Sequence, residues 1–122
     1  MRDTSTPDDI QGRVRVDERP RALATRLEAG EIAVIDRPDL DRQSALALAA
    51  RQPAAVLNAA PSATGRHKVL GAAALLDAGI LLIDDLGQDI MTLREGERIR
   101  IVGDRVLRDG SVVASGRRVS YW

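Results

Sequence analysis

The sequence predicts a single α/β domain, with a mainly parallel core sheet flanked by helices and a C-terminal β-meander. Three short apolar runs, at residues 31–35, 54–58 and 80–83, alternate with segments of helical periodicity. This order is typical of strand–helix–strand units whose strands lie parallel in one sheet. After Gly87 the pattern changes to short alternating runs between Gly-containing turns, which are typical of β-hairpins. At 122 residues the chain has the length of one domain.

The N-terminal part begins with a polar, acidic stretch, residues 1–12, which we expect to be a disordered tail before a domain of residues 13–122. The segment Arg13–Val16 alternates polar and apolar residues and predicts a short, half-buried edge strand. A helix is expected over residues 21–28, where two leucines are four residues apart, with Gly30 as its C-terminal stop.

The first buried strand, residues 31–35, leads into an acidic turn and then a helix through Arg51. Asp39 or Asp41 can cap this helix, because a carboxylate accepts hydrogen bonds from the free N–H groups of the first turn. Pro53 ends the helix. The residues expected on its buried face are Leu46, Ala49 and Ala50.

The second buried strand, residues 54–58, is followed by a loop and by a helix over residues 68–78. Gly79 is expected to end this helix, and residues 80–83 form the third buried strand. The apolar stripe of the helix, at helical spacing, consists of Val69, Ala72, Ala73 and Leu76.

The C-terminal part predicts only short elements. Residues 88–94 have the pattern of a helical turn or a short strand. The runs at 97–102, 105–107 and 111–114 alternate and are separated by Gly-containing turns, as in a β-meander.

Composition excludes several classes of site and partner. The formal net charge is zero, and basic residues are interrupted by acidic ones, so we expect no nucleic-acid binding. The absence of Cys excludes disulfides, thiolate metal sites and Cys nucleophiles. No apolar run has the length of a signal peptide core or a membrane span, so we expect a cytoplasmic chain without direct membrane insertion.

The loop after the second buried strand is the strongest candidate site. Open α/β sheets bind ligands at the carboxyl ends of their strands, and free N–H groups at a helix start attract anions. We therefore expect no resident cofactor but a small anion, such as phosphate or a nucleotide. The expected ligand-binding residues are Asn58, Ser62, Thr64, Gly65 and Arg66. The alternative is a structural helix entry, in which Ser62 or Thr64 caps the helix and Arg66 is solvated.

Three further residues are expected near this loop: Asp36, His67 and Asp84. Asp36 and Asp84 follow parallel strands, so their side chains can lie at the same edge of the sheet as Arg66. Carboxylates at this edge could bind a metal or act as general bases, but turn and capping chemistry explains such residues equally well. With one His, no Cys and no nucleophile placed beside a base, we predict no catalytic residue and no metal site.

Three segments carry a resemblance to known families. GEIAVID (30–36), AGILLID (78–84) and REGERIRIVGDRV (94–106) resemble, in this order, the swivelling β/β/α domain. That fold serves as the mobile phosphohistidine domain of phosphoenolpyruvate-using enzymes. The longer block from Gly30 to Asp84 is similar to the N-terminal domain of SteA-type actinobacterial cytokinesis proteins, and the likeness covers about residues 14–115.

The resemblance implies a non-catalytic interaction or regulatory domain in cell division and cell separation. In the SteA-type family this domain precedes a region similar to thiamine pyrophosphokinase, a C-terminal hydrophobic segment tethers the protein to the membrane, and SteB is the protein partner. Because the 122 residues contain none of that region, we expect an N-terminal fragment of a longer protein. The alternatives are a nucleotide- or phosphoryl-handling domain that works with the missing catalytic region, and a structural domain that forms a homo-oligomer.

His67 is the residue that suggests phosphoryl transfer. In the phosphohistidine domains the carrier histidine lies nine residues before the glycine that matches Gly79, and this position holds Leu70 here. SteA-type domains commonly have Tyr at the position of His67. The resemblance therefore implies that the nucleophile of the carrier domains is lost.

Overall fold

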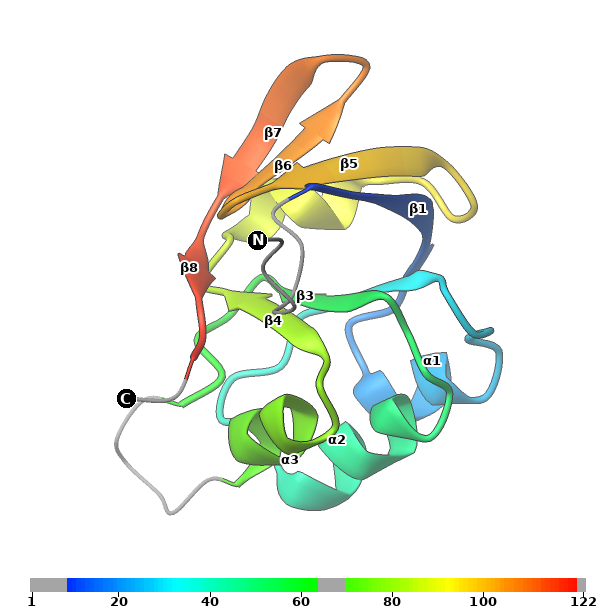
Figure 1. Cartoon of the computed structure of the whole chain (residues 1–122), viewed down its shortest axis with the longest axis vertical. Coiled ribbons are helices and arrows are strands. Elements are labelled where there is room, and N and C mark those ends of the chain that lie inside the picture. The colour runs from blue at the N-terminus through cyan, green and yellow to red at the C-terminus, as the bar shows by residue number, and fades with distance from the viewer. Residues whose placement is uncertain (1–8, 64–69, 121–122) are drawn as a thin grey trace, which may run out of the picture.

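A computed structural model of the chain describes residues 9–63 and 70–120. The helices are α1 (Pro20–Ala24), α2 (Arg42–Ala49), α3 (Gly71–Asp77) and the 3₁₀ helix η1 (Gln88–Thr92). The strands are β1 (Asp9–Val16), β2 (Ile32–Ile35), β3 (Ala55–Asn58), β4 (Leu81–Asp84), β5 (Arg98–Val102), β6 (Arg105–Arg108), β7 (Ser111–Ser115) and β8 (Arg117–Arg118). Helices α1, α2 and α3 lie on one face of the parallel strands, and an antiparallel layer together with the 3₁₀ helix η1 lies on the other face (Figure 1). The expected α/β class is confirmed.

Within these residues the strands form one eight-stranded sheet in the order β7-β6-β5-β1-β2-β3-β4-β8. The pairs β1–β2, β2–β3 and β3–β4 are parallel, as the three continuous apolar runs predict. The pairs β5–β6 and β6–β7 are antiparallel and form the expected C-terminal meander, and β5 also pairs antiparallel with the N-terminal strand β1. The two-residue strand β8, which the sequence did not predict, pairs antiparallel with β4.

Strand β1 differs from its prediction in two respects. It begins at Asp9, so residues 9–12 belong to the sheet and not to the expected tail. It is also an interior strand, because residues 9–13 pair with β5 and residues 14–16 pair with β2. The alternating pattern shows which side chains face the core, but it carries no information about whether both edges of the strand are hydrogen-bonded.

Two apolar cores lie on opposite faces of the parallel strands, because successive side chains of a strand point to opposite faces. The helix-side core contains Leu23, Leu27, Ala33, Ile35, Leu40, Ala45, Leu48, Val56, Leu75 and Leu82. The core beneath the antiparallel layer contains Val14, Ile32, Val34, Leu57, Leu81, Ile83, Ile90, Ile99, Ile101 and Val106. Both faces of β2, β3 and β4 are therefore covered, and all four residues of each strand are buried.

The helices are shorter than predicted, and the predicted buried faces of α2 and α3 are correct only in part, since Ala49 and Ala72 pack against the helix-side core. The buried residues of α2 are Ser44, Ala45 and Leu48, whereas the expected Leu46 is 40% exposed. The buried residues of α3 are Gly71, Ala74 and Leu75. Of the predicted stripe, Ala72 is half-buried and packs against the helix-side core, Ala73 and Leu76 are half-buried, and Val69 lies outside the described residues. Both helices are rich in Ala and Leu, and apolar residues therefore occur on all of their faces. Helical periodicity alone cannot select one face in such a segment.

The predicted N-terminal cap of α2 and the predicted glycine stop of α3 are confirmed. The Asp41 carboxylate accepts a hydrogen bond from the Ser44 backbone N–H at 3.0 Å and so caps α2. Gly79, with φ of +77°, follows α3. The N–H groups of Gly79 and Ile80 donate to the carbonyls of Leu76 and Leu75, a hydrogen-bond pattern that requires a left-handed residue.

Candidate functional site

The predicted site lies at the carboxyl edge of the parallel strands, where the loops that follow β2, β3 and β4 meet. Asn58 is the last residue of β3 and Asp84 is the last residue of β4. Asp36 directly follows β2. The described part of the loop after β3 includes Ser62, which is 1% exposed.

Asn58 is completely buried and holds two loops together. Its side-chain oxygen accepts hydrogen bonds from the backbone N–H groups of Arg37 at 3.0 Å and Ala60 at 3.1 Å. Its side-chain nitrogen donates to the Arg37 carbonyl at 2.9 Å and to the Ser62 hydroxyl at 3.1 Å. Both acceptor lone pairs and both N–H donors of the amide are therefore occupied within the fold.

Asp84 is a second completely buried polar residue, and its carboxylate accepts three hydrogen bonds. One comes from the Ser62 backbone N–H at 2.8 Å. The other two come from Nε and Nη2 of Arg117, each at 3.1 Å, in the parallel arrangement typical of a guanidinium and a carboxylate. The hydrogen bonds that the guanidinium donates to Asp84 raise the pKa of Arg117 above its ordinary value.

Backbone hydrogen bonds fix the same loop from both sides. The N–H groups of Asp39 and Leu40, before α2, donate to the carbonyls of Pro61 and Ser62. On the other side, the N–H group of Asp85, after β4, donates to the Ala60 carbonyl at 3.1 Å. The loop is therefore a structural bridge between the segments that follow β2 and β4.

The structure brings together three of the predicted site residues, Asn58, Ser62 and Asp84, through direct hydrogen bonds. Asp36 has a different partner, because its carboxylate accepts a hydrogen bond from the Gln88 side chain of η1 at 2.8 Å. The other predicted residues, Thr64, Gly65, Arg66 and His67, lie outside the described residues.

Arg117 is the residue of this cluster that sequence reasoning missed. It lies 33 residues after Asp84, in a strand of two residues that has no recognisable pattern. The glycine that precedes Arg117, Gly116, is the feature of the sequence that indicates a close approach of two strands. A Cβ atom on Gly116 would lie 2.4 Å from the Asp84 carbonyl oxygen, so only glycine allows this close approach of β8 to β4.

The arrangement has the chemistry of an internal ion pair. Among the described residues, every buried side-chain nitrogen and oxygen has a hydrogen-bond partner. No group of three or more His, Cys, Asp or Glu residues in that part of the chain is placed to hold a metal ion.

None of the helices in the described ranges is long and apolar enough to span a membrane. The chain matches no protein-family model and no curated protein sequence.

Proposed function

We propose that the chain is a non-catalytic interaction and regulatory domain of a SteA-like protein that acts in cell division and cell separation. The proposal includes a swivelling-type β/β/α fold, a cytoplasmic location and a position before a thiamine pyrophosphokinase-like region. It also includes a SteB-type protein partner. The resemblance of residues 30–84 to SteA-type domains supports this assignment. The order of layers, with helices on one face of parallel strands and an antiparallel layer on the other, is compatible with the β/β/α fold.

One observation carries the non-catalytic part of the proposal. Asn58, Ser62 and Asp84, the described polar residues at the centre of the carboxyl edge where an open α/β sheet would place a ligand, are hydrogen-bonded to one another. The Ser62 N–H that could bind an external anion instead binds the carboxylate of Asp84, at 2.8 Å. A buried polar cluster with all of its partners inside the fold favours a framework for a surface over a reaction centre.

A domain replacement tests the cellular role. In an actinobacterium, the N-terminal domain of the resident SteA-type protein is replaced by residues 1–122 of this chain. We expect daughter cells to separate normally under the light microscope. A matched replacement by an unrelated domain of the same length should leave cells attached. If both replacements leave cells attached, the assignment to this family is wrong.

The competing role is a nucleotide- or phosphoryl-handling domain, and thermal unfolding separates it from the proposal. The chain is heated alone and with phosphate, ATP or thiamine phosphates. A ligand that binds only the folded state adds about 2.7 kcal/mol of stability at a hundredfold excess over its Kd. We expect no change in the midpoint. A rise that Arg66→Ala abolishes would replace our proposal with the competing one.

A further inference from the structure

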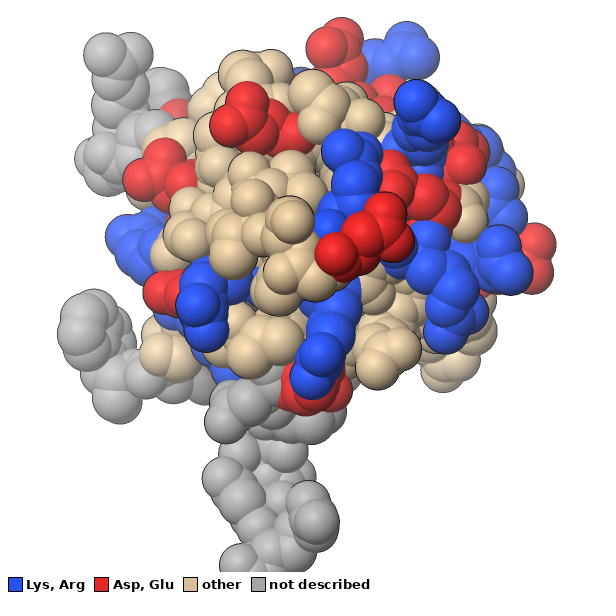
Figure 2. Space-filling model, turned by 90° about the horizontal axis from the view of Figure 1, so that it is seen from above, with Lys and Arg blue, Asp and Glu red and all other residues tan. Residues whose placement is uncertain are grey.

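The outer face of the antiparallel layer is unusually rich in arginine. Side chains alternate along β1 and β5, so that Val14, Ile99 and Ile101 are buried while Arg13, Arg98 and Arg100 point outward. Arg13 and Arg98 are directly opposite each other in the antiparallel pair. Like charges in this position repel and destabilise the sheet. Figure 2 shows charged side chains of both signs gathered over one side of this face.

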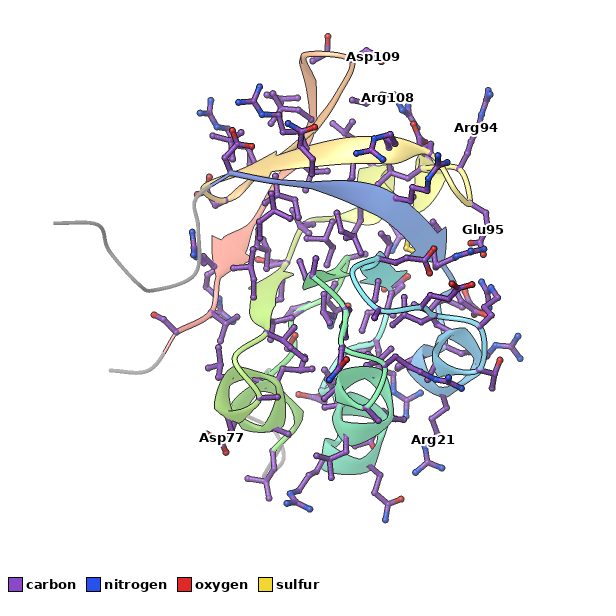
Figure 3. The ribbon with its side chains drawn as sticks, turned by 45° about the vertical axis from the view of Figure 1, so that its right-hand side comes forward. Arg21, Asp77, Arg94, Glu95, Arg108 and Asp109 are labelled. Atoms are coloured by element: carbon purple, nitrogen blue, oxygen red, sulfur yellow. The ribbon has the colours of Figure 1, made fainter. Side chains whose placement is uncertain are left out.

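Two hollows lie on either side of the β6–β7 turn. The first has a volume of about 290 Å³ and is lined by Gln11, Arg98, Arg100, Leu107 and Asp109, among others. The second, of about 310 Å³, is lined by Thr92, Arg94, Glu97, Arg108 and Asp109. Asp109 is common to both. Figure 3 shows Arg94, Arg108 and Asp109 on the same side of the molecule, with Asp109 at the tip of the turn.

The arginines of these hollows differ in how their charge is balanced. Arg108 donates two hydrogen bonds to Glu97, at 3.0 and 2.8 Å. Arg100 binds the carboxylate of Asp9 with two hydrogen bonds. Among residues 9–63 and 70–120, the side chain of Arg98 forms no ion pair, and Arg94 interacts with Glu97 only at longer range. The exposed guanidinium group of Arg98 can therefore donate hydrogen bonds to an external anion.

We propose that the first hollow and its rim bind an extended acidic segment of a protein partner, with carboxylates at alternate positions. Arg98 and Arg100 are two residues apart on β5, and side chains with this separation repeat at about 6.6–6.8 Å along a strand. The carboxylates of an extended ligand with acidic residues at alternate positions have the same repeat. Asp9 already occupies Arg100 with two parallel hydrogen bonds, so a ligand carboxylate binds at Arg100 by displacing that of Asp9 and binds at Arg98 without such an exchange.

Apolar neighbours favour a peptide over a nucleic acid. Leu107 is paired with Arg100 across β5–β6 and with Val112 across β6–β7, and Val112 is 51% exposed. The CH₂ groups of the ligand's glutamate side chains can pack against these two residues, because the side chains between them point away from the surface in an extended peptide. Single-stranded nucleic acid is bound chiefly by basic grooves with aromatic side chains for stacking, and the sequence has only one Tyr and one Trp.

We thereby extend the proposed role as an interaction domain, on which this inference rests, by naming a surface and a partner chemistry. Fluorescence anisotropy of the full 122-residue chain tests it at low salt. The probe is a fluorescein-labelled peptide of four Glu-Ser repeats, and the control peptide has Gln in place of Glu. We expect saturable binding of the Glu peptide alone. Arg98→Gln should weaken it about two- to fivefold, the range expected for one exposed charge pair.

Two further variants sharpen the result. Asp109→Asn removes a negative charge from the rim and keeps a residue type that tolerates the φ of +50° at this position, so binding should strengthen about two- to fivefold. Arg51→Gln makes the same charge change as Arg98→Gln at an exposed position after α2 and should leave binding unchanged.

Several outcomes would overturn this proposal. They are equal binding of the two peptides, equal weakening by Arg51→Gln and Arg98→Gln, displacement of the peptide by equimolar inorganic phosphate, and tighter binding of oligothymidylate than of the Glu peptide. Because the assay uses no native partner, it is independent of the domain replacement. A negative peptide result with normal cell separation would reject this surface alone, and the reverse pattern would reject the family role alone.

Discussion

Asp84 is a fully buried carboxylate, and among the described residues the side chain of Arg117 balances its charge. Asp84→Ala would leave the Ser62 N–H buried without its acceptor and would remove both hydrogen bonds of the guanidinium. Breaking a fully buried pair costs about 3–5 kcal/mol, but Arg117 is 62% exposed and water can solvate it after the change. We therefore expect a loss of about 2–4 kcal/mol in the free energy of unfolding. Urea unfolding followed by circular dichroism measures it.

A matched control distinguishes loss of this pair from loss of a negative charge in general. Asp89, in η1, is exposed, and Asp89→Ala should change the free energy of unfolding by less than about 0.5 kcal/mol. If the two substitutions lower the free energy of unfolding equally, the hydrogen bonds of Asp84 do not stabilise the loop after β3.

At the level of elements, the strands could be predicted from sequence and the helix faces could not. Continuous apolar runs located β2, β3 and β4 because both faces of these strands are covered. In α2 and α3 the apolar pattern has no unique face, so only the packing of the two helices selects the buried one.

In the candidate site, the positions of the residues could be predicted from sequence and their hydrogen-bond partners could not. Asn58 and Asp84 could be placed at one edge because parallel strands bring their carboxyl ends together. Their roles could not be predicted, since their partners include Arg37 and Arg117, which local patterns do not connect to them. Strand β8 supplies Arg117 to the site through its pairing with β4, and no local sequence pattern indicates this pairing.

At Gly71, the first residue of α3, helix propensity and packing predict opposite changes in the free energy of unfolding for Gly71→Ala. A Cβ atom on Gly71 would lie 2.2 Å from the Leu40 carbonyl oxygen, which also accepts the Gly71 N–H at 3.1 Å. Helix propensity alone would make Gly71→Ala stabilising by about 0.5–1 kcal/mol. The close contact instead predicts destabilisation by about 1–3 kcal/mol, because α3 must move away from the loop before α2. A higher urea midpoint for Gly71→Ala would contradict this packing.

For the whole molecule, a net charge of zero conceals a network of arginine–carboxylate contacts. A hydrogen bond from Arg15 lowers the pKa of Glu31, and one from Arg108 lowers the pKa of Glu97. Burial would raise the pKa of Glu95, but hydrogen bonds from Arg26 and from the Val16 N–H outweigh it and the pKa is lowered. These contacts connect β1 to the residue before β2, and they connect the segment after α1 and strand β6 to the segment before β5.

The lowered pKa values fix the sign of the pH dependence. Between the folded and unfolded pKa values of these carboxyl groups, the unfolded chain binds more protons than the folded chain. Their contribution to stability is therefore complete above the unfolded values of about 4.3 for Glu, and it is lost as pH falls through the lower folded values. We expect the urea midpoint to be nearly constant from pH 7 to 5.5 and to fall continuously below pH about 4.5.

Glu97→Gln tests whether these contacts cause the acid sensitivity. The amide cannot ionise, so the variant should be less stable at pH 7, where the charged Arg108 pair is lost, and its midpoint should fall less steeply at acidic pH. Glu28→Gln, at an exposed position, should have the wild-type profile. If the urea midpoint of Glu97→Gln falls between pH 5 and 3 with the wild-type slope, the pKa of Glu97 does not differ between the folded and the unfolded chain. The ion pair would then be a surface contact of no energetic consequence, as many exposed pairs are.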